Sequence, residues 1–148
     1  MTKCYFAHPY SKRGGVGERR IIKTLEKRGI EPINPFDGED KFLAERGIEG
    51  GKYYKKPLFD VACEMWEMDM KSVADTDILL AWIPKLSLGT PQELAIAAML
   101  LGHGIIIISS IRHPSIAFYK QNYGARLYDS IDDFENNIES SWGNEPVA

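Results

Sequence analysis

The sequence predicts a single α/β domain with a flavodoxin-like, Rossmann-like fold: a five-stranded parallel sheet with helices on both faces. Short apolar runs rich in strand formers alternate with segments of helical periodicity, and this alternation favours a parallel sheet. Five strands favour the order 2-1-3-4-5. The chain has 148 residues and no repeat or linker, so one domain is expected over residues 1–148.

The first half of the chain contains two short predicted strands with a helix between them. The strands cover residues 4–7 and 31–33, and the helix ends at Gly29. The helix is predicted to be amphipathic, because an apolar stripe lies opposite several charged side chains. That stripe includes Ile21, Ile22 and Leu25.

Residues 36–57 are polar and contain four glycines, Gly38, Gly47, Gly50 and Gly51. This composition predicts a long loop with one short helix near Phe42 and Leu43. Loops of this length inside a compact domain are usually functional or mobile.

The second half continues the same alternation of helices and strands. The expected elements are a helix over 58–74, a strand over 77–83, a helix over 91–101, a strand over 105–108, a loop over 109–115, helical turns over 116–121, a strand over 125–128 and a last helix. Ser130 is the predicted N-cap of that last helix. The tail from about residue 143 is expected to be frayed.

The stretch from Ser87 to Glu93 is the first candidate for a site of chemistry. It follows a buried strand and leads into an apolar helix, and loops of this kind carry the ligand contacts of open α/β sheets. Thr90 is a suitable N-cap and Glu93 follows three residues later, so one interpretation is a capping box. The other interpretation is a carboxylate, kept ionised by the helix dipole, that acts as a nucleophile on a sugar carbon.

A second loop is expected at the same edge of the sheet. Residues 8–15 follow the first strand, and in the order 2-1-3-4-5 they meet the loop of residues 84–90 after the third strand. The second loop has the cations, hydroxyl and glycines of an anion-binding loop, although a solvated basic turn has the same composition. Its candidate ligand contacts are His8, Ser11, Lys12, Arg13, Gly14 and Gly15.

Asp69 is a second candidate acid. It lies on the predicted helix of residues 58–74, which is expected to deliver side chains toward the same end of the sheet. The alternative is an exposed helical aspartate beside Glu64 and Glu67, since most charged residues on helices are solvated.

The composition excludes several classes of site and partner. A formal net charge of −3 offers no basic surface to a nucleic-acid polymer. The longest apolar runs are about half as long as a membrane span, and the amino terminus leads directly into a strand without a signal peptide. Cys4 and Cys63 are expected to be free thiols, and no metal-ligand spacing occurs. These features predict a cytoplasmic protein that needs no metal or cofactor.

Several of these motifs, in this order, resemble the nucleoside 2-deoxyribosyltransferase superfamily, most closely its branch of 2'-deoxynucleoside 5'-monophosphate N-glycosidases. The resemblance covers roughly residues 4–138. Its most specific part is the Ser-Leu-Gly-x-x-x-Glu-Leu element that starts at Ser87, with Asp69 located 24 positions before Glu93. Tyr5 with Phe6, the Ser/Arg/Gly-Gly loop and residues 77–81 complete it.

The resemblance implies catalytic roles for three residues. Glu93 would be the nucleophile at the anomeric carbon. Asp69 would handle protons at the base and at the sugar hydroxyls. Tyr5 would line the sugar and orient the carboxylates.

The resemblance also implies a substrate site shared between two subunits. Ser11, Arg13 and Ser87 would hold a 5'-phosphate, and Ser115 would complete that site from the partner subunit of a homodimer or a higher even oligomer. The full set of expected substrate contacts is His8, Ser11, Arg13, Gly14, Ser87, Gly89 and Ser115.

Three functions are open at this point. The first is hydrolysis of the N-glycosidic bond of a (2'-deoxy)nucleoside 5'-monophosphate. The second is transfer of deoxyribose between bases on unphosphorylated nucleosides, in which a second base replaces water. The third is a non-catalytic nucleotide sensor that uses the same pocket. The transferases usually carry an acid in the loop before the catalytic helix, where this chain has Ser87.

Overall fold

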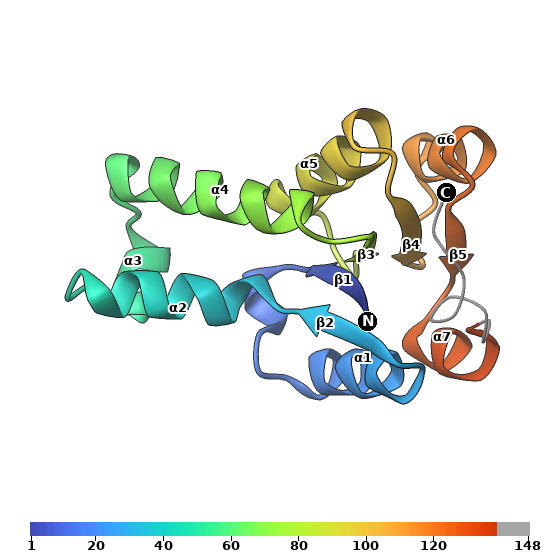
Figure 1. Ribbon diagram of the computed structural model, residues 1–148, viewed down its shortest axis with the longest axis horizontal. Coiled ribbons are helices and arrows are strands. Elements are labelled where there is room, and N and C mark those ends of the chain that lie inside the picture. Colours follow the sequence, from blue (N-terminus) through green and yellow to red (C-terminus); the bar gives the residue numbers. More distant parts are fainter. Residues whose placement is uncertain (139–148) are drawn as a thin grey trace.

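A computed structural model describes residues 1–138 and shows a five-stranded parallel sheet between two layers of helices (Figure 1). The strands are β1 (Thr2–Ala7), β2 (Ile30–Ile33), β3 (Ile78–Trp82), β4 (Gly104–Ile108) and β5 (Arg126–Tyr128). Their order is β2-β1-β3-β4-β5, and every neighbouring pair is parallel. The predicted fold class and strand order are therefore confirmed.

The helices are α1 (Val16–Lys27), α2 (Pro35–Glu45), α3 (Gly50–Lys55), α4 (Phe59–Ala74), α5 (Gly89–Ala95), α6 (Pro114–Tyr123) and α7 (Ile131–Asn137). Helices pack on both faces of the sheet, while α2 and α3 extend away from it beside the first part of α4 (Figure 1). One core cluster joins α1 and α7 to side chains such as Phe6 and Leu80. The other joins α4, α5 and α6 to the alternate side chains, such as Tyr5 and Leu79. Both faces of the strands are buried, as expected of a parallel sheet.

The expectation of a long loop over residues 36–57 was wrong. The structure places α2 and α3 there, and α2 begins with Pro35 after Asn34, whose side chain accepts a hydrogen bond from the Phe36 N–H at 3.1 Å. Leu43, Tyr53 and Met65 form a small third core between α2, α3 and α4. This tertiary packing stabilises helices whose local composition favours a loop.

The predicted capping box at Thr90 was also wrong. Helix α5 already begins at Gly89 after Leu88, and no side chain caps it. The helix continues through a π-helical turn at Ile96–Leu100. The expected helix is therefore present, but its last turns are π-helical. The prediction for Ser130 is confirmed, because its hydroxyl accepts a hydrogen bond from the Asp133 N–H at 3.0 Å.

The loop that was expected over residues 109–115 is shorter in the structure. Helix α6 begins at Pro114, and the His113 side chain caps it by accepting from the Ser115 N–H at 3.1 Å. Ser115 therefore lies in the first turn of a helix.

Three other features bear on the predictions. Both cysteines are free, with Cys4 buried and Cys63 exposed. None of the described helices is long and apolar enough to cross a membrane. The expected fraying of the tail from residue 143 concerns residues outside the described part of the chain.

Candidate active site

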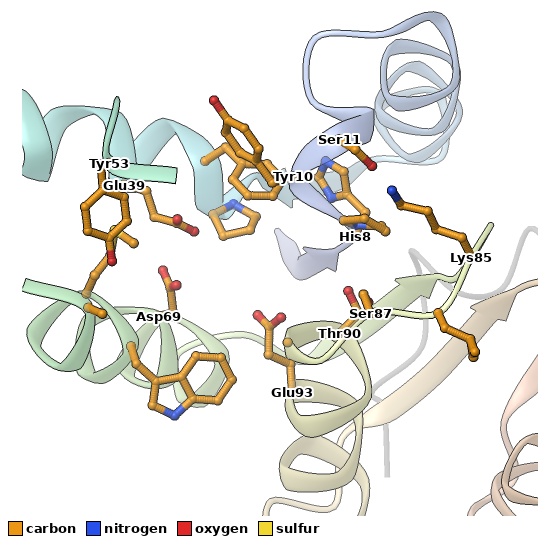
Figure 2. A pocket seen from close by; sticks show the side chains of 18 residues that line it. His8, Tyr10, Ser11, Glu39, Tyr53, Asp69, Lys85, Ser87, Thr90 and Glu93 are labelled. Atoms are coloured by element: carbon orange, nitrogen blue, oxygen red, sulfur yellow. The ribbon is translucent and has the colours of Figure 1, made fainter. Parts of the chain in front are cut away.

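A cavity of about 450 Å³ lies beyond the carboxyl ends of β1 and β3, where the strand order reverses (Figure 2). The loops after these two strands form one side, and α2, α4 and α5 form the others. This is where open α/β sheets bind ligands. Its lining includes six of the predicted site residues: His8, Ser11, Asp69, Ser87, Gly89 and Glu93. Tyr5, Arg13, Gly14 and Ser115 do not line it directly.

Glu93 projects into the cavity from α5 and is only 7% exposed (Figure 2). Burial raises the pKa of its carboxyl group from 4.5 to about 7, the nearby Tyr5 hydroxyl opposes this rise, and the charge of Glu39 adds to it. The expected effect of the helix dipole is thus outweighed by desolvation. A carboxyl group with this pKa is partly ionised near neutral pH.

Asp69 projects into the same cavity from α4 (Figure 2) and is likewise 7% exposed. The alternative of an exposed helical aspartate was therefore wrong. Burial raises the pKa of Asp69 well above its ordinary value, and the charges of Glu39 and Glu93 raise it further. Asp69 consequently holds its proton more tightly than Glu93 does and can donate it to a leaving group at neutral pH.

Tyr5 lies behind Glu93 on β1 and is completely buried. Its hydroxyl is close enough to the Glu93 carboxyl group to affect the pKa of that group. However, it has no partner at hydrogen-bonding distance and angle among the described residues. Burial, and then the charges of Glu93 and Asp69, raise the pKa of the phenol, so it remains a donor.

Glu39 is a third buried acid that the sequence reasoning missed. It lies on α2, lines the cavity opposite Asp69 (Figure 2), and accepts a hydrogen bond from the Tyr54 hydroxyl. Burial raises its pKa, and Tyr54 and Asp69 oppose that rise by hydrogen bonding. The helical signal was available in Asn34-Pro35, an N-cap followed by proline.

His8 lines the cavity, but both of its ring nitrogens contact protein oxygens. Nε2 lies 2.7 Å from Glu18 Oε2, and Nδ1 lies 2.9 Å from the Phe6 carbonyl oxygen. The Gly14 N–H donates to the other oxygen of Glu18 at 3.1 Å. His8 and Gly14 therefore fix the loop after β1, and the N–H of Gly14 is already used within it.

At the end of the cavity away from the three acids, the cationic and hydroxyl groups come from the loops after β1 and β3. Ser11 and Lys85 face each other across this end of the cavity (Figure 2). The buried hydroxyl of Ser87 has no hydrogen-bond partner among the described residues. Lys85 was missed as a site residue, although it lies two positions before Ser87 in the sequence.

Arg13 and Ser115 lie elsewhere. The Arg13 guanidinium pairs with Asp40 on α2 and contacts the Tyr10 hydroxyl at 3.3 Å. The Ser115 hydroxyl lies 2.8 Å from His113 Nδ1 on an exposed turn. Within residues 1–138, no cluster of three or more histidine, cysteine or acidic side chains could hold a metal ion.

Neither a family model nor a curated protein matches the chain. Its structure, however, is similar to that of a 2-deoxyribosyltransferase from Bacillus psychrosaccharolyticus. That similarity covers 99% of this chain and 100% of the other, with a TM-score of 0.66 and 17% sequence identity. The chain has the fold of the 2-deoxyribosyltransferases.

Two further solved structures share this fold. The CMP N-glycosidase BcmB of Clostridium botulinum matches 91% of this chain and 96% of its own, with a TM-score of 0.58 and 15% identity. A 2-deoxyribosyltransferase from Leishmania mexicana matches 94% of this chain and 100% of its own, with a TM-score of 0.59 and 16% identity. The fold implied by the sequence resemblance is therefore confirmed over nearly the whole chain.

Proposed function

We propose that this protein is an enzyme of the nucleoside 2-deoxyribosyltransferase superfamily that hydrolyses the N-glycosidic bond of a (2'-deoxy)nucleoside 5'-monophosphate. The observation that carries the proposal is the pair of buried acids, Asp69 and Glu93, which face one cavity with different affinities for a proton. Two carboxyl groups with separated pKa values are what glycosidic cleavage requires. The fold shared with a CMP N-glycosidase and two transferases supports the same chemistry.

In the first step, the Glu93 carboxylate attacks the anomeric carbon of the sugar. The bond between that carbon and the base nitrogen breaks, and its electron pair leaves with the base. Asp69 donates its proton to the base, which departs neutral. A glycosyl ester on Glu93 results, and the nearby Tyr5 hydroxyl would stabilise the carboxylate of Glu93 before and after this step.

In the second step, a water molecule attacks the same carbon. The Asp69 carboxylate takes a proton from that water, the ester bond to Glu93 breaks, and the sugar 5-phosphate is released. Both acids return to their starting states, so no cofactor is consumed. Burial of the acids favours this cycle, because charges interact more strongly away from water.

The 5'-phosphate would bind at the end of the cavity formed by Ser11, Lys85 and Ser87. Lys85 supplies a positive charge there, and the unpartnered Ser87 hydroxyl supplies a donor. The phosphate carries nearly two negative charges at neutral pH, so a cation and several donors are needed. Arg13 is proposed to assist from the rim, and Ser115 is proposed to contribute from the partner subunit of a homodimer.

The main alternative is deoxyribosyl transfer between bases, in which a second base takes the place of water. The structural similarity to a 2-deoxyribosyltransferase over 99% of this chain favours this alternative. A non-catalytic nucleotide sensor is a further alternative from a different class. In the loop before α5, where the transferases usually carry an acid for a sugar hydroxyl, the residues that line the cavity are Lys85, Leu86 and Ser87, and this favours the phosphorylated substrate.

One experiment separates the three functions. Purified protein is incubated with nucleosides and nucleoside monophosphates, with and without a free acceptor base, and the bases are separated by chromatography. Base release from monophosphates without an acceptor is the expected result. Base exchange that occurs only with an acceptor would identify a transferase, and binding without turnover would identify a sensor.

A further inference from the structure

Glu39 is buried in the catalytic cavity, yet the reaction described above does not use it. Its side chain comes from α2, is 6% exposed, and faces Asp69 across the cavity (Figure 2). A third buried acid beside two others is unfavourable unless protons or hydrogen-bond donors offset the repulsion. The contacts of Glu39 show which of the acids holds a proton.

Glu39 has donors that favour its charged form. The Tyr54 hydroxyl donates to Glu39 Oε1. The ring of Tyr54 stacks on that of Tyr10 with 3.7 Å between centroids, which fixes the direction of the hydroxyl. At the rim, the charge of Asp40 raises the pKa of Glu39, and the positive charge of Arg13, which pairs with Asp40, opposes that rise.

Asp69 has the opposite surroundings. It shares the cavity with Glu39 and Glu93 (Figure 2), and its burial and both of these neighbours raise its pKa. The carboxyl groups of Asp69 and Glu39 face each other in the cavity, and each shifts the pKa of the other. Two neighbouring acids can share one proton, and these surroundings favour Asp69 as the donor and Glu39 as the acceptor.

We propose that Glu39 is a positioning residue that accepts a hydrogen bond from Asp69 and thereby keeps Asp69 protonated as the acid for the departing base. Tyr54 holds Glu39 in the acceptor role. This inference rests on the proposed function. When Asp69 gives its proton to the base, two adjacent carboxylates remain, and their repulsion makes Asp69 a stronger base toward the attacking water.

Other ionisable groups also face this pair from the elements packed around it. They are Tyr5 on β1, Tyr53 and Tyr54 on α3, and Glu93 on α5. Burial is the first cause of the raised pKa of each tyrosine, so these groups remain neutral donors at working pH. The pH response of the pair is therefore governed by Glu39, Asp69 and Glu93.

The test compares Glu39→Gln with Glu45→Gln, an exposed position on the same helix. An amide at position 39 can donate to Asp69, so it favours the Asp69 carboxylate. The alkaline limb of the kcat profile should move at least one pH unit lower in Glu39→Gln. At pH 8, kcat should fall at least about tenfold for nucleotides whose base needs a proton to leave. Glu45→Gln should behave as wild type.

A matched pair of substrates separates positioning from folding. An N7-methylated purine nucleotide releases a neutral base without receiving a proton, so Glu39→Gln should change its kcat less than about twofold. The parent purine nucleotide should show the full loss, consistent with general-acid magnitudes. Equal losses on both substrates, or an unmoved alkaline limb, would overturn the proposal.

A second measurement does not depend on activity. Carbon-13 NMR of labelled aspartate follows the ionisation of Asp69 in the whole protein without substrate. Asp69 should be protonated at pH 7 in the wild type and should ionise at a lower pH in Glu39→Gln. An ionised Asp69 at pH 7 in the wild type contradicts the pairing. A protonated Asp69 in a protein without turnover contradicts only the proposed function.

Discussion

The two ends of the cavity are built on different principles. At one end, α2, α4 and α5 bury three carboxyl groups, Glu39, Asp69 and Glu93, among aromatic side chains. At the other end, Ser11, Lys85 and Ser87 lie on loops, and Lys85 is exposed. The acids are buried side chains on helices, whereas Ser11 and Lys85 at the loop end are exposed. The acids can therefore perform chemistry, while the loops can bind a charged group.

This difference has an energetic consequence. A buried acid with a raised pKa destabilises the folded protein whenever it is ionised. An exposed lysine and two serines destabilise the folded protein far less. We therefore expect substitutions at the acidic end to change turnover and pH-dependent stability, and substitutions at the loop end to change affinity for phosphate.

The largest effect is expected at Glu93, the proposed nucleophile. Glu93→Gln should lower turnover at least about 1,000-fold, because an amide cannot form the glycosyl ester. Steady-state base release measures the effect, with Glu67→Gln on the exposed side of α4 as control. A folded Glu93→Gln protein with nearly wild-type turnover would leave Glu93 as an ordinary helical residue.

The same substitution should stabilise the protein at alkaline pH. The pKa of Glu93 rises from 4.5 to about 7 on folding, so the folded state binds a proton more tightly than the unfolded state. Ionisation of Glu93 should therefore lower wild-type stability by roughly 3 kcal/mol between these two pH values, in addition to the contributions of Asp69 and Glu39. Urea unfolding at pH 4 and pH 8 measures this fall.

Glu93→Gln cannot lose that proton. It should be about as stable as the wild type at pH 4 and more stable at pH 8, and Glu67→Gln should follow the wild type at both. If Glu93→Gln and the wild type differ equally at both pH values, ionisation of Glu93 is not the cause.

At the loop end, Lys85→Ala should weaken binding of a nucleoside monophosphate at least about tenfold, since charge-assisted hydrogen bonds contribute roughly 1.5–3 kcal/mol. Binding of the unphosphorylated nucleoside should change less than about twofold. Calorimetry with the Glu93→Gln background avoids turnover during the measurement.

Arg13→Ala is the matched comparison for Lys85→Ala. The Arg13 guanidinium already pairs with Asp40, so its loss should weaken monophosphate binding less than the loss of Lys85. The reverse order would place the phosphate nearer the rim, beside Tyr10 and Arg13.

The smallest effect is expected at Ser115. A neutral hydroxyl contributes about 1 kcal/mol, so Ser115→Ala should weaken monophosphate binding by a few-fold and leave nucleoside binding unchanged. Analytical ultracentrifugation of the same samples gives the oligomeric state. If Ser115 acts from a partner subunit, the wild type should lose the same few-fold affinity on dilution to monomers, and an unchanged affinity would contradict this role.

Glu93 was predicted to face the site from the buried strand and glycine turn before it, and Asp69 from its helix together with the family resemblance. For Glu39 the local signal was only the N-cap at Asn34, because its helix is stabilised by contacts with α3 and α4, which come later in the chain. The glycine-rich composition around it favoured a loop.

The sequence by itself determined the alternation of strands and helices, the strand order and the convergence of the two loops at the edge of the sheet. These follow from hydrophobic periodicity and from the topology of parallel sheets, which are local or general properties. Three features became visible only in the folded chain: the raised pKa values of the acids, the contacts of His8 and Gly14 with Glu18, and the pairing of Arg13 with Asp40. A pKa depends on burial and on charges brought together from distant segments, and neither is encoded in the spacing of residues along the chain.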